Sequence, residues 1–393
     1  MFFTVSGNLK SEVLALFGEF KNIFKVACIY MATIIGAGFA SGQEIMQFFS
    51  SYYEGGFYGI ILAGILFSII GYVVLDKVYS ERIRNYEEFL FPTVGWFFGW
   101  VMEILVTMFM ISVFCIMIAG AGGIISDKLS IPYYFAVLIV ALLCALVFFT
   151  EIRGIVNISS ILTPILIFGI LGFGLYIIVS KEMAVFNFSG SISKITDNWF
   201  FSSLLYVSYN SIASVVVMCS LLPYLKNRKT AVLGGVLGGV MLCFMAIIIN
   251  FAIYLFYPHI PTEDLPVMGM VDSYSSVLGN IYTVILLLAM FVSALTAGFG
   301  FVERISSKIN ISKKVIILVI CALSIPLSSV GFSGLISTIY PVFGYMGMFM
   351  VFAIVIQLFA KVPAYVRVEE DRSNDSYRIG AKKKGKVRHI KKI

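Results

Sequence analysis

Ten apolar runs dominate this 393-residue sequence, and each is long enough to cross a lipid bilayer as a helix. A bilayer core of ~30 Å needs about 20 apolar residues, because a helix rises ~1.5 Å per residue. The chain is 60% hydrophobic and 12% charged, with a mean hydropathy of +0.98, which excludes an ordinary soluble domain. We predict an all-α integral membrane protein with about ten transmembrane helices. The predicted spans are 24–50, 56–76, 93–125, 132–150, 155–180, 198–222, 231–257, 272–302, 314–330 and 333–360.

The starts of these spans repeat with a nearly constant offset. Each of the first five spans precedes the span five places later by about 174 to 182 residues. The offset predicts two five-helix repeats, at 24–180 and 198–360. Because five is odd, the second repeat must be inverted in the membrane relative to the first, as in many secondary transporters. An N-terminal segment, 1–23, and a basic tail, 361–393, flank the repeats.

The positive charges predict the orientation of the chain in a cell membrane. Of the 28 Lys and Arg residues, Lys128, Lys181 and Lys194 alone fall in segments outside the cytoplasm if the N-terminus is inside. The positive-inside rule therefore predicts a multi-pass plasma-membrane protein with both termini in the cytoplasm. The basic tail is expected to be solvated or to contact anionic lipid, and nothing in it indicates nucleic-acid binding.

The first span has a composition that disfavours a continuous helix. Gly36, Gly38 and Gly42 each weaken a helix by roughly 1 kcal/mol relative to alanine, and Ser41 and Gln43 bring polar groups to membrane depth. Irregular backbone at that depth survives only where it faces protein or a watery cavity. We predict an interruption here that faces either protein or a watery cavity.

The sixth span occupies the equivalent place in the second repeat and carries hydroxyls and an amide in place of glycines. We predict that this helix is interrupted too, within the run 204–214. The polar residues of this run that we expect to bind substrate are Tyr206, Ser208, Asn210 and Ser211.

A broken helix offers free N–H groups at one half-helix end and free carbonyl groups at the other. Gly36 and Gly38 have no side chain to hinder a ligand, so a substrate carboxylate is expected at their N–H groups. Close helix packing is the alternative role of these glycines. Ser41 and Glu44, directly after them, favour a binding site.

Two acidic residues, Glu44 and Glu103, lie well inside the predicted spans. Inserting each costs on the order of 2.5 to 3.5 kcal/mol, so an idle role is disfavoured. Each is a candidate to bind a substrate amine, to bind a cation or to carry a proton. For Glu103 a neutral carboxyl that bonds to neighbouring backbone or hydroxyl groups remains an equal alternative.

Ser293 and Thr296 in the eighth span are three residues apart and therefore share one helical face. Two hydroxyls with main-chain carbonyls from a broken helix form an oxygen cage that suits Na⁺. Hydrogen bonds from both hydroxyls to their own helix are the alternative. The expected coupling ion is Na⁺ or H⁺, and no other cofactor is expected.

The run from Ile35 to Glu44, followed by Gln47, Phe48 and Phe49, resembles the signature of the bacterial YkvI family of membrane proteins. That family is related to the amino acid, polyamine and organocation transporters, which share the LeuT-type five-plus-five inverted repeat.

The resemblance implies that Gly36, Ala37 and Gly38 form the unwound segment that holds a substrate carboxylate. It also implies that the carbonyls of Ala32 and Ile35, with the Thr296 hydroxyl, form a cation site. The sequence departs from the familiar sodium site at one position, because Ala297 follows Thr296 and the second hydroxyl, Ser293, lies a turn earlier.

These features predict a cation-coupled secondary active transporter of a small amino acid or a related zwitterion or amine, working by alternating access. Spans one, two, six and seven are expected to rock against spans three, four, eight and nine. A non-transporting ligand sensor or receptor subunit of the same fold is the alternative. An enzyme is not expected, because both histidines, His259 and His389, lie outside the spans.

Overall fold

The computed structural model describes residues 2–149, 151–180, 194–256, 265–330 and 332–359, and residues 1–356 form one compact unit. All regular structure in the described ranges is helical, which confirms the predicted fold class. The longer helices are α1 (Phe2–Ile34), α4 (Glu54–Ser80), α6 (Trp96–Leu129), α7 (Tyr133–Phe148), α8 (Glu151–Ser180), α9 (Trp199–Cys219), α10 (Arg228–Phe256), α12 (Ser276–Lys308), α13 (Lys313–Leu327) and α14 (Phe332–Phe359). The shorter ones are α2 (Ala37–Ser41), α3 (Gln43–Phe48), α5 (Tyr86–Val94), α11 (Pro266–Tyr274) and the 3₁₀ turns η1 (Ser50–Tyr52), η2 (Leu222–Tyr224) and η3 (Ser328–Val330).

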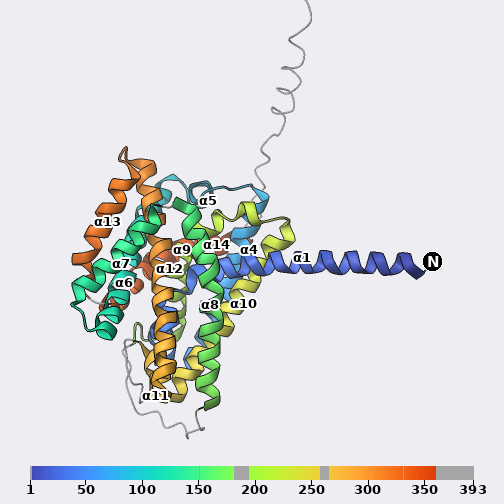
Figure 1. Ribbon diagram of the computed structural model, residues 1–393. Coiled ribbons are helices and arrows are strands. Elements are labelled where there is room, and N and C mark those ends of the chain that lie inside the picture. The colour runs from blue at the N-terminus through green and yellow to red at the C-terminus, as the bar shows by residue number, and fades with distance from the viewer. Residues whose placement is uncertain (1, 150, 181–193, 257–264, 331, 360–393) are drawn as a thin grey trace, which may run out of the picture. The chain divides into compact units, whose positions relative to one another are not determined.

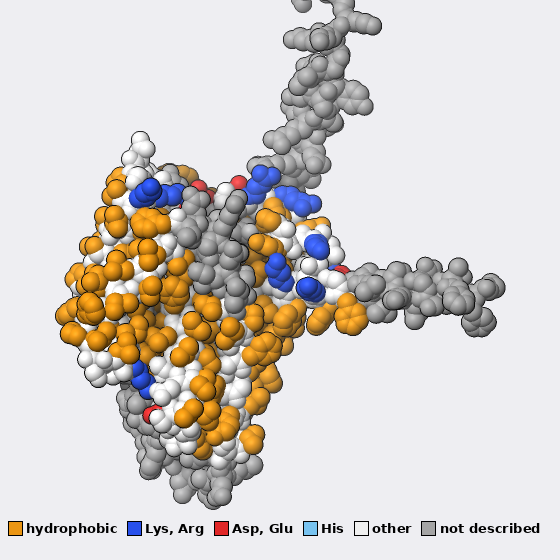
Figure 2. All heavy atoms as spheres, in the orientation of Figure 1, with side chains coloured by type: hydrophobic (Ala, Val, Ile, Leu, Met, Phe, Trp, Pro, Cys, Tyr) orange, Lys and Arg blue, Asp and Glu red, His pale blue; other side chains and the backbone are white. Residues whose placement is uncertain are grey.

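The outer surface of the helices carries large apolar side chains. Phe168, Phe244 and Phe352 are more than half exposed, as are many other large apolar residues. Figure 2 shows that apolar side chains cover the middle of the visible face, while most of the visible Lys and Arg lie towards one end. Such a surface requires lipid around it, because water would leave this apolar area unburied. Six of the described helices are long and apolar enough to cross a bilayer without a break.

The two halves of the chain repeat the same order of helices. The short helices α5 and α11, which the span prediction did not include, begin at Tyr86 and Pro266, 180 residues apart. Helices α6 and α12 follow them and begin at Trp96 and Ser276, with the same separation. Figure 1 shows α5 and α11 at opposite ends of the helical bundle. An inverted repeat requires this placement, so the five-plus-five architecture is confirmed.

Two groups of helices pack most densely within the described residues. Helices α1, α4, α9 and α10 form one group, and α6, α7, α12 and α13 form the other. These are the spans that we expected to move against each other. In the first group Gly71 and Gly235 bring α4 and α10 together, because a Cβ on Gly71 would lie 2.6 Å from the Gly235 carbonyl oxygen.

The sixth span differs from the prediction, because α9 is one continuous helix. Its run contains no glycine or proline, so the backbone has no reason to unwind. Its polar side chains bond to the helix itself: the Asn210 amide donates to the Tyr206 carbonyl at 3.0 Å, and the Ser211 hydroxyl donates to the Val207 carbonyl at 2.6 Å. Hydroxyls and amides can thus sit in an intact membrane helix.

Candidate functional site

The first span breaks at Ile35 and Gly36. The Ile35 N–H still donates to the Met31 carbonyl at 2.8 Å. The Gly36 N–H, which would reach Ala32 in a continuous helix, donates instead to the Ile34 carbonyl at 2.8 Å, and Gly36 is extended. The break is therefore shorter than predicted, since Ala37 and Gly38 already belong to α2.

A second change of direction joins α2 to α3 at Gly42. Its φ of 82° is left-handed, and a Cβ there would lie 2.7 Å from Cγ2 of Val267 in α11. The Ser41 hydroxyl donates to the Gly38 carbonyl at 3.1 Å and accepts from the Gln43 N–H at 3.3 Å. Ser41, which we predicted to bind substrate, is thus engaged in the turn itself.

Helix α2 is fixed to α12 by one buried side chain. The Tyr282 hydroxyl donates to the Ala40 carbonyl at 2.5 Å, and the Tyr282 ring packs edge-on against Phe173 of α8, 5.1 Å between centroids. A five-residue helix has little stability of its own, so this contact sets where α2 lies.

The Glu44 carboxyl folds back over α2. A Cβ on Gly38 would lie 2.2 Å from Glu44 Oε1, so the carboxyl occupies the space that the glycine leaves. The residue is 3% exposed, and its Oε2 has no hydrogen-bond partner among the described residues. Nor does any Lys or Arg of the described ranges form an ion pair with it. A buried carboxyl without such a partner is costly, which makes Glu44 a candidate functional residue.

Three tyrosines lie within electrostatic range of this carboxyl. Tyr206 and Tyr209 of α9 and Tyr340 of α14 all interact electrostatically with Glu44. The Tyr206 and Tyr209 hydroxyls do not meet hydrogen-bond geometry with any described residue, although Tyr209 is near the carboxyl. The Tyr209 ring stacks on the Tyr340 ring with centroids 4.5 Å apart, and the centroid of the Phe48 ring lies 5.5 Å from that of Tyr209.

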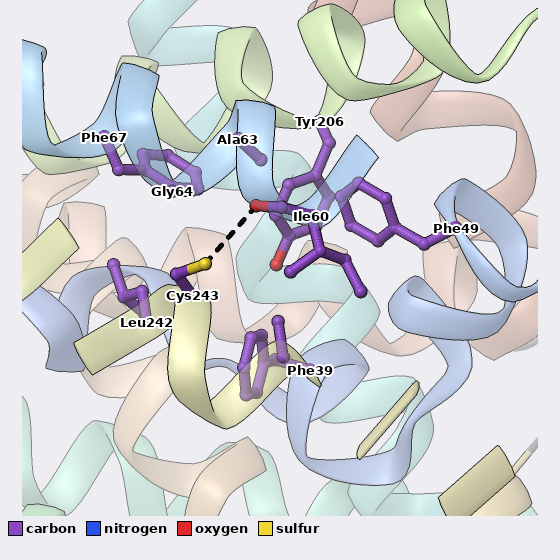
Figure 3. A pocket seen from close by; sticks show the side chains of 10 residues that line it. Phe39, Phe49, Ile60, Ala63, Gly64, Phe67, Tyr206, Leu242 and Cys243 are labelled. Atoms are coloured by element: carbon purple, nitrogen blue, oxygen red, sulfur yellow. Dashed lines mark hydrogen bonds between the residues drawn. The ribbon is translucent and has the colours of Figure 1, made fainter. Parts of the chain in front are cut away.

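A small cavity with aromatic walls adjoins Tyr206. Figure 3 shows the Tyr206 ring entering it from α9, opposite Phe39 of α2, with Phe49 and Ile60 alongside. In this conformation the cavity has room for about one water molecule. At the edge of the cavity, the Cys243 thiol donates a hydrogen bond to the Ile60 carbonyl, with 3.7 Å between sulfur and oxygen.

The sequence predicted some of this site and missed the rest. Tyr206 lies at the cavity, while Asn210 and Ser211 turn to their own helix and Ser208 is buried in α9. Tyr209 and Tyr340 were not predicted. Tyr206 and Tyr209 are three apart and share a helical face, and that spacing is a signal the sequence contained.

Of the two hydroxyl residues predicted to bind the cation, Ser293 is the one that the structure describes directly beside the break. Ser293 of α12 lies beside Gly36, since a Cβ on Gly36 would be 3.4 Å from the Ser293 hydroxyl oxygen. The Thr296 hydroxyl donates to the Val292 carbonyl at 2.9 Å, which leaves oxygen lone pairs free. Ala32, Ser293 and Thr296 are half-buried and Ile35 is buried. Among the described residues no cluster of three His, Cys, Asp or Glu could bind a metal.

Glu103, which we predicted at the substrate site, belongs elsewhere. Its carboxylate lies 2.6 Å from Arg304 Nη1 and 2.9 Å from Lys308 Nζ. Helix α12 extends six residues past the predicted span end at 302, and this extension brings both cations into reach. Arg304 is eleven residues beyond Ser293, roughly 16 Å along the helix, so Glu103 is remote from the break.

Comparisons with known proteins identify relatives of this chain. No family model matches it. It is 26% identical to the uncharacterized membrane protein YkvI of Bacillus subtilis, over 82% of this chain and 92% of YkvI. It is 24% identical to the uncharacterized protein YyaD of the same organism, over 82% of this chain and 93% of YyaD.

Solved structures share the fold at low sequence identity. A manganese transporter of Eremococcus coleocola matches with a TM-score of 0.58 and 15% identity, covering 85% of this chain and 78% of the transporter. The structure of MhsT in complex with L-phenylalanine matches with a TM-score of 0.57 and 13% identity, covering 83% of this chain and 87% of MhsT. A Na⁺-coupled sialic acid symporter matches with a TM-score of 0.53 and 13% identity, covering 86% of this chain and 78% of the symporter. All three are transporters rather than enzymes. The chain is thus a homologue of YkvI and YyaD with the LeuT-type fold of these transporters.

Proposed function

We propose that the protein is a cation-coupled secondary active transporter of a small amino acid or a related zwitterion or amine. The observation that carries this proposal is the broken first span, whose Gly36 lies beside Ser293 of α12 and whose Glu44 is buried without an ion-pair partner in the described residues. In membrane proteins such features mark substrate and ion sites.

The two helix groups support alternating access. The break directly follows α1 and Tyr206 lies on α9, both of the first group, and Glu44 lies on α3, which contacts α9 and α10. Ser293 and Thr296 lie on α12 of the second group. A ligand bound between the groups favours whichever arrangement fits it, so substrate and ion can shift the same equilibrium. The solved transporters of this fold, one of them Na⁺-coupled, support the proposal by analogy.

The coupling ion we propose is Na⁺ at Ala32, Ile35, Ser293 and Thr296, with a proton on Glu44 as the alternative. The Ser293 position beside Gly36 supports Na⁺, because it puts a hydroxyl near the carbonyls at the end of α1. Glu44 Oε2, which has no hydrogen-bond partner among the described residues, supports the proton.

The function is tested by flux into proteoliposomes that contain the full chain. Radiolabelled L-alanine, L-phenylalanine and ethanolamine serve as probes, each under an imposed Na⁺ gradient, an imposed proton gradient or none. Uptake that accumulates a probe only under one gradient is expected. Uptake that no gradient changes would contradict coupling, and binding without flux would favour a ligand sensor of the same fold.

A further inference from the structure

The charges of the side chains near Glu44 indicate the class of substrate. The carboxyl is buried, and within the described ranges it has tyrosines around it but no Lys, Arg or His paired to it. The other deeply buried carboxyl, Glu103, has two cations against it. A site with one carboxylate and no positive side chain attracts a positively charged ligand and repels an anion.

The position of the carboxyl also opposes a substrate carboxylate. Glu44 Oε1 occupies the space directly over Gly38, where a Cβ would lie only 2.2 Å away. A ligand carboxylate placed on this stretch of backbone would meet that oxygen at close range. Two carboxylates cannot both be ionised at such a separation without a cation between them.

Aromatic rings supply the rest of a cation site. Tyr206 lies 4.9 Å from Phe49 and 5.9 Å from Phe67 between ring centroids, and all three line the cavity of Figure 3 together with Phe39. Faces of Phe and Tyr rings attract ammonium groups, most strongly where water is excluded. The Tyr206 side chain is buried, and its hydroxyl lacks a hydrogen-bond partner among the described residues. Buried polar groups of this kind ordinarily have a partner, which a ligand would supply.

We propose that the ligand of this site is a small organic cation, a primary or methylated amine without a carboxylate. Its nitrogen pairs with the Glu44 carboxylate, and its apolar part lies against Phe39, Phe49 and Tyr206. This inference rests on the transport function proposed above and narrows its substrate class. The cavity holds about one water in the present conformation, so the aromatic walls must separate to admit the ligand.

The test compares ligands of similar size and different charge on the purified full chain. Thermal shift and isothermal titration are measured with n-propylamine, tetramethylammonium, L-alanine and propionate. Stabilisation by one of the two cations, with at least tenfold weaker binding of L-alanine and propionate, is expected. Equal or tighter binding of L-alanine or propionate overturns the inference, and so does the absence of binding by both cations.

Variants assign the binding to Glu44. Glu44→Gln is expected to weaken binding of the cation at least tenfold, whereas Asp76→Asn, which removes a carboxylate of a surface ion pair in α4, leaves binding unchanged. Each shift is measured against the same variant without ligand. Should Glu44→Gln not fold, Tyr206→Phe removes one unpartnered hydroxyl and is expected to weaken binding while preserving the fold. Unchanged binding in both variants overturns the inference.

Binding and flux separate this inference from the transport function. Cation binding without gradient-driven uptake would contradict transport and leave the ligand class standing. Gradient-driven uptake of L-alanine without cation binding would support transport and overturn the ligand class.

Discussion

The Glu103 carboxylate of α6 and the Arg304 guanidinium of α12 lie 2.6 Å apart, with Glu103 and Arg304 side chains 3% and 11% exposed. The Arg304 guanidinium also lies over the Tyr86 ring of α5, 4.7 Å from its centroid. The pair thus connects three helices and joins α6 to α12 within one helix group.

Breaking this pair is expected to destabilise the protein without affecting ligand binding. Arg304→Ala leaves the buried Glu103 carboxylate with Lys308 alone, so part of the ~3 kcal/mol that an uncompensated buried charge costs is expected. The double variant Glu103→Gln/Arg304→Met is expected to regain part of that loss, because it removes the buried carboxylate. Thermal unfolding in detergent measures both. A double variant less stable than Arg304→Ala would contradict this account.

Gly42 is expected to tolerate no side chain. Gly42→Ala places a Cβ at a left-handed φ and 2.7 Å from Val267, so a lower unfolding temperature is expected from a backbone cost of about 1 to 2 kcal/mol plus the clash. Gly123→Ala, in α6, is the matched control. A Cβ there meets nothing within 4 Å, so its stability should be unchanged or higher.

The two glycines at the break are expected to differ. Gly38→Ala displaces the Glu44 carboxyl and should weaken binding of n-propylamine at least tenfold. Gly36→Ala meets the Ser293 hydroxyl at 3.4 Å, in a backbone conformation open to alanine, and should have the milder effect. Titration calorimetry on both variants makes the comparison. A larger loss in Gly36→Ala would contradict the position assigned to Glu44.

Removing the hydroxyls of α12 tests the cation site. Ser293→Ala and Thr296→Val are each expected to raise the Na⁺ concentration needed for half-maximal stabilisation or uptake several-fold, because each removes an oxygen ligand. Ser112→Ala, which removes an exposed hydroxyl of α6, should leave this Na⁺ concentration unchanged. Wild-type Na⁺ dependence in both α12 variants would exclude this site and move the coupling role to Glu44.

The predicted orientation is tested by a fluorescent-protein fusion to the C-terminus. The positive-inside rule predicts a cytoplasmic tail, where the fused protein folds and fluoresces. A dark fusion at normal expression level, with activity of an export-dependent alkaline phosphatase fused at the same place, would reverse the orientation.

Hydropathy and glycine content along the chain were sufficient to predict the spans, the fold and the break in the first span. Length of an apolar run and glycine content are local properties, and a bilayer enforces them directly because backbone groups in lipid must bond within their own helix. The constant offset between spans was enough to reveal the two repeats.

The partners of the two buried carboxyls depend on the tertiary structure and could not be predicted from the sequence. Glu103 meets a cation 201 positions away in sequence, on a helix that continues past its apolar part, while Glu44 meets Tyr209 and Tyr340 instead. The tertiary structure also decided that α9 stays intact, since bonds from Asn210 and Ser211 to their own helix satisfy the polar groups that had indicated a break. Hydropathy measures the cost of inserting a polar group, but its partner depends on which helices pack together.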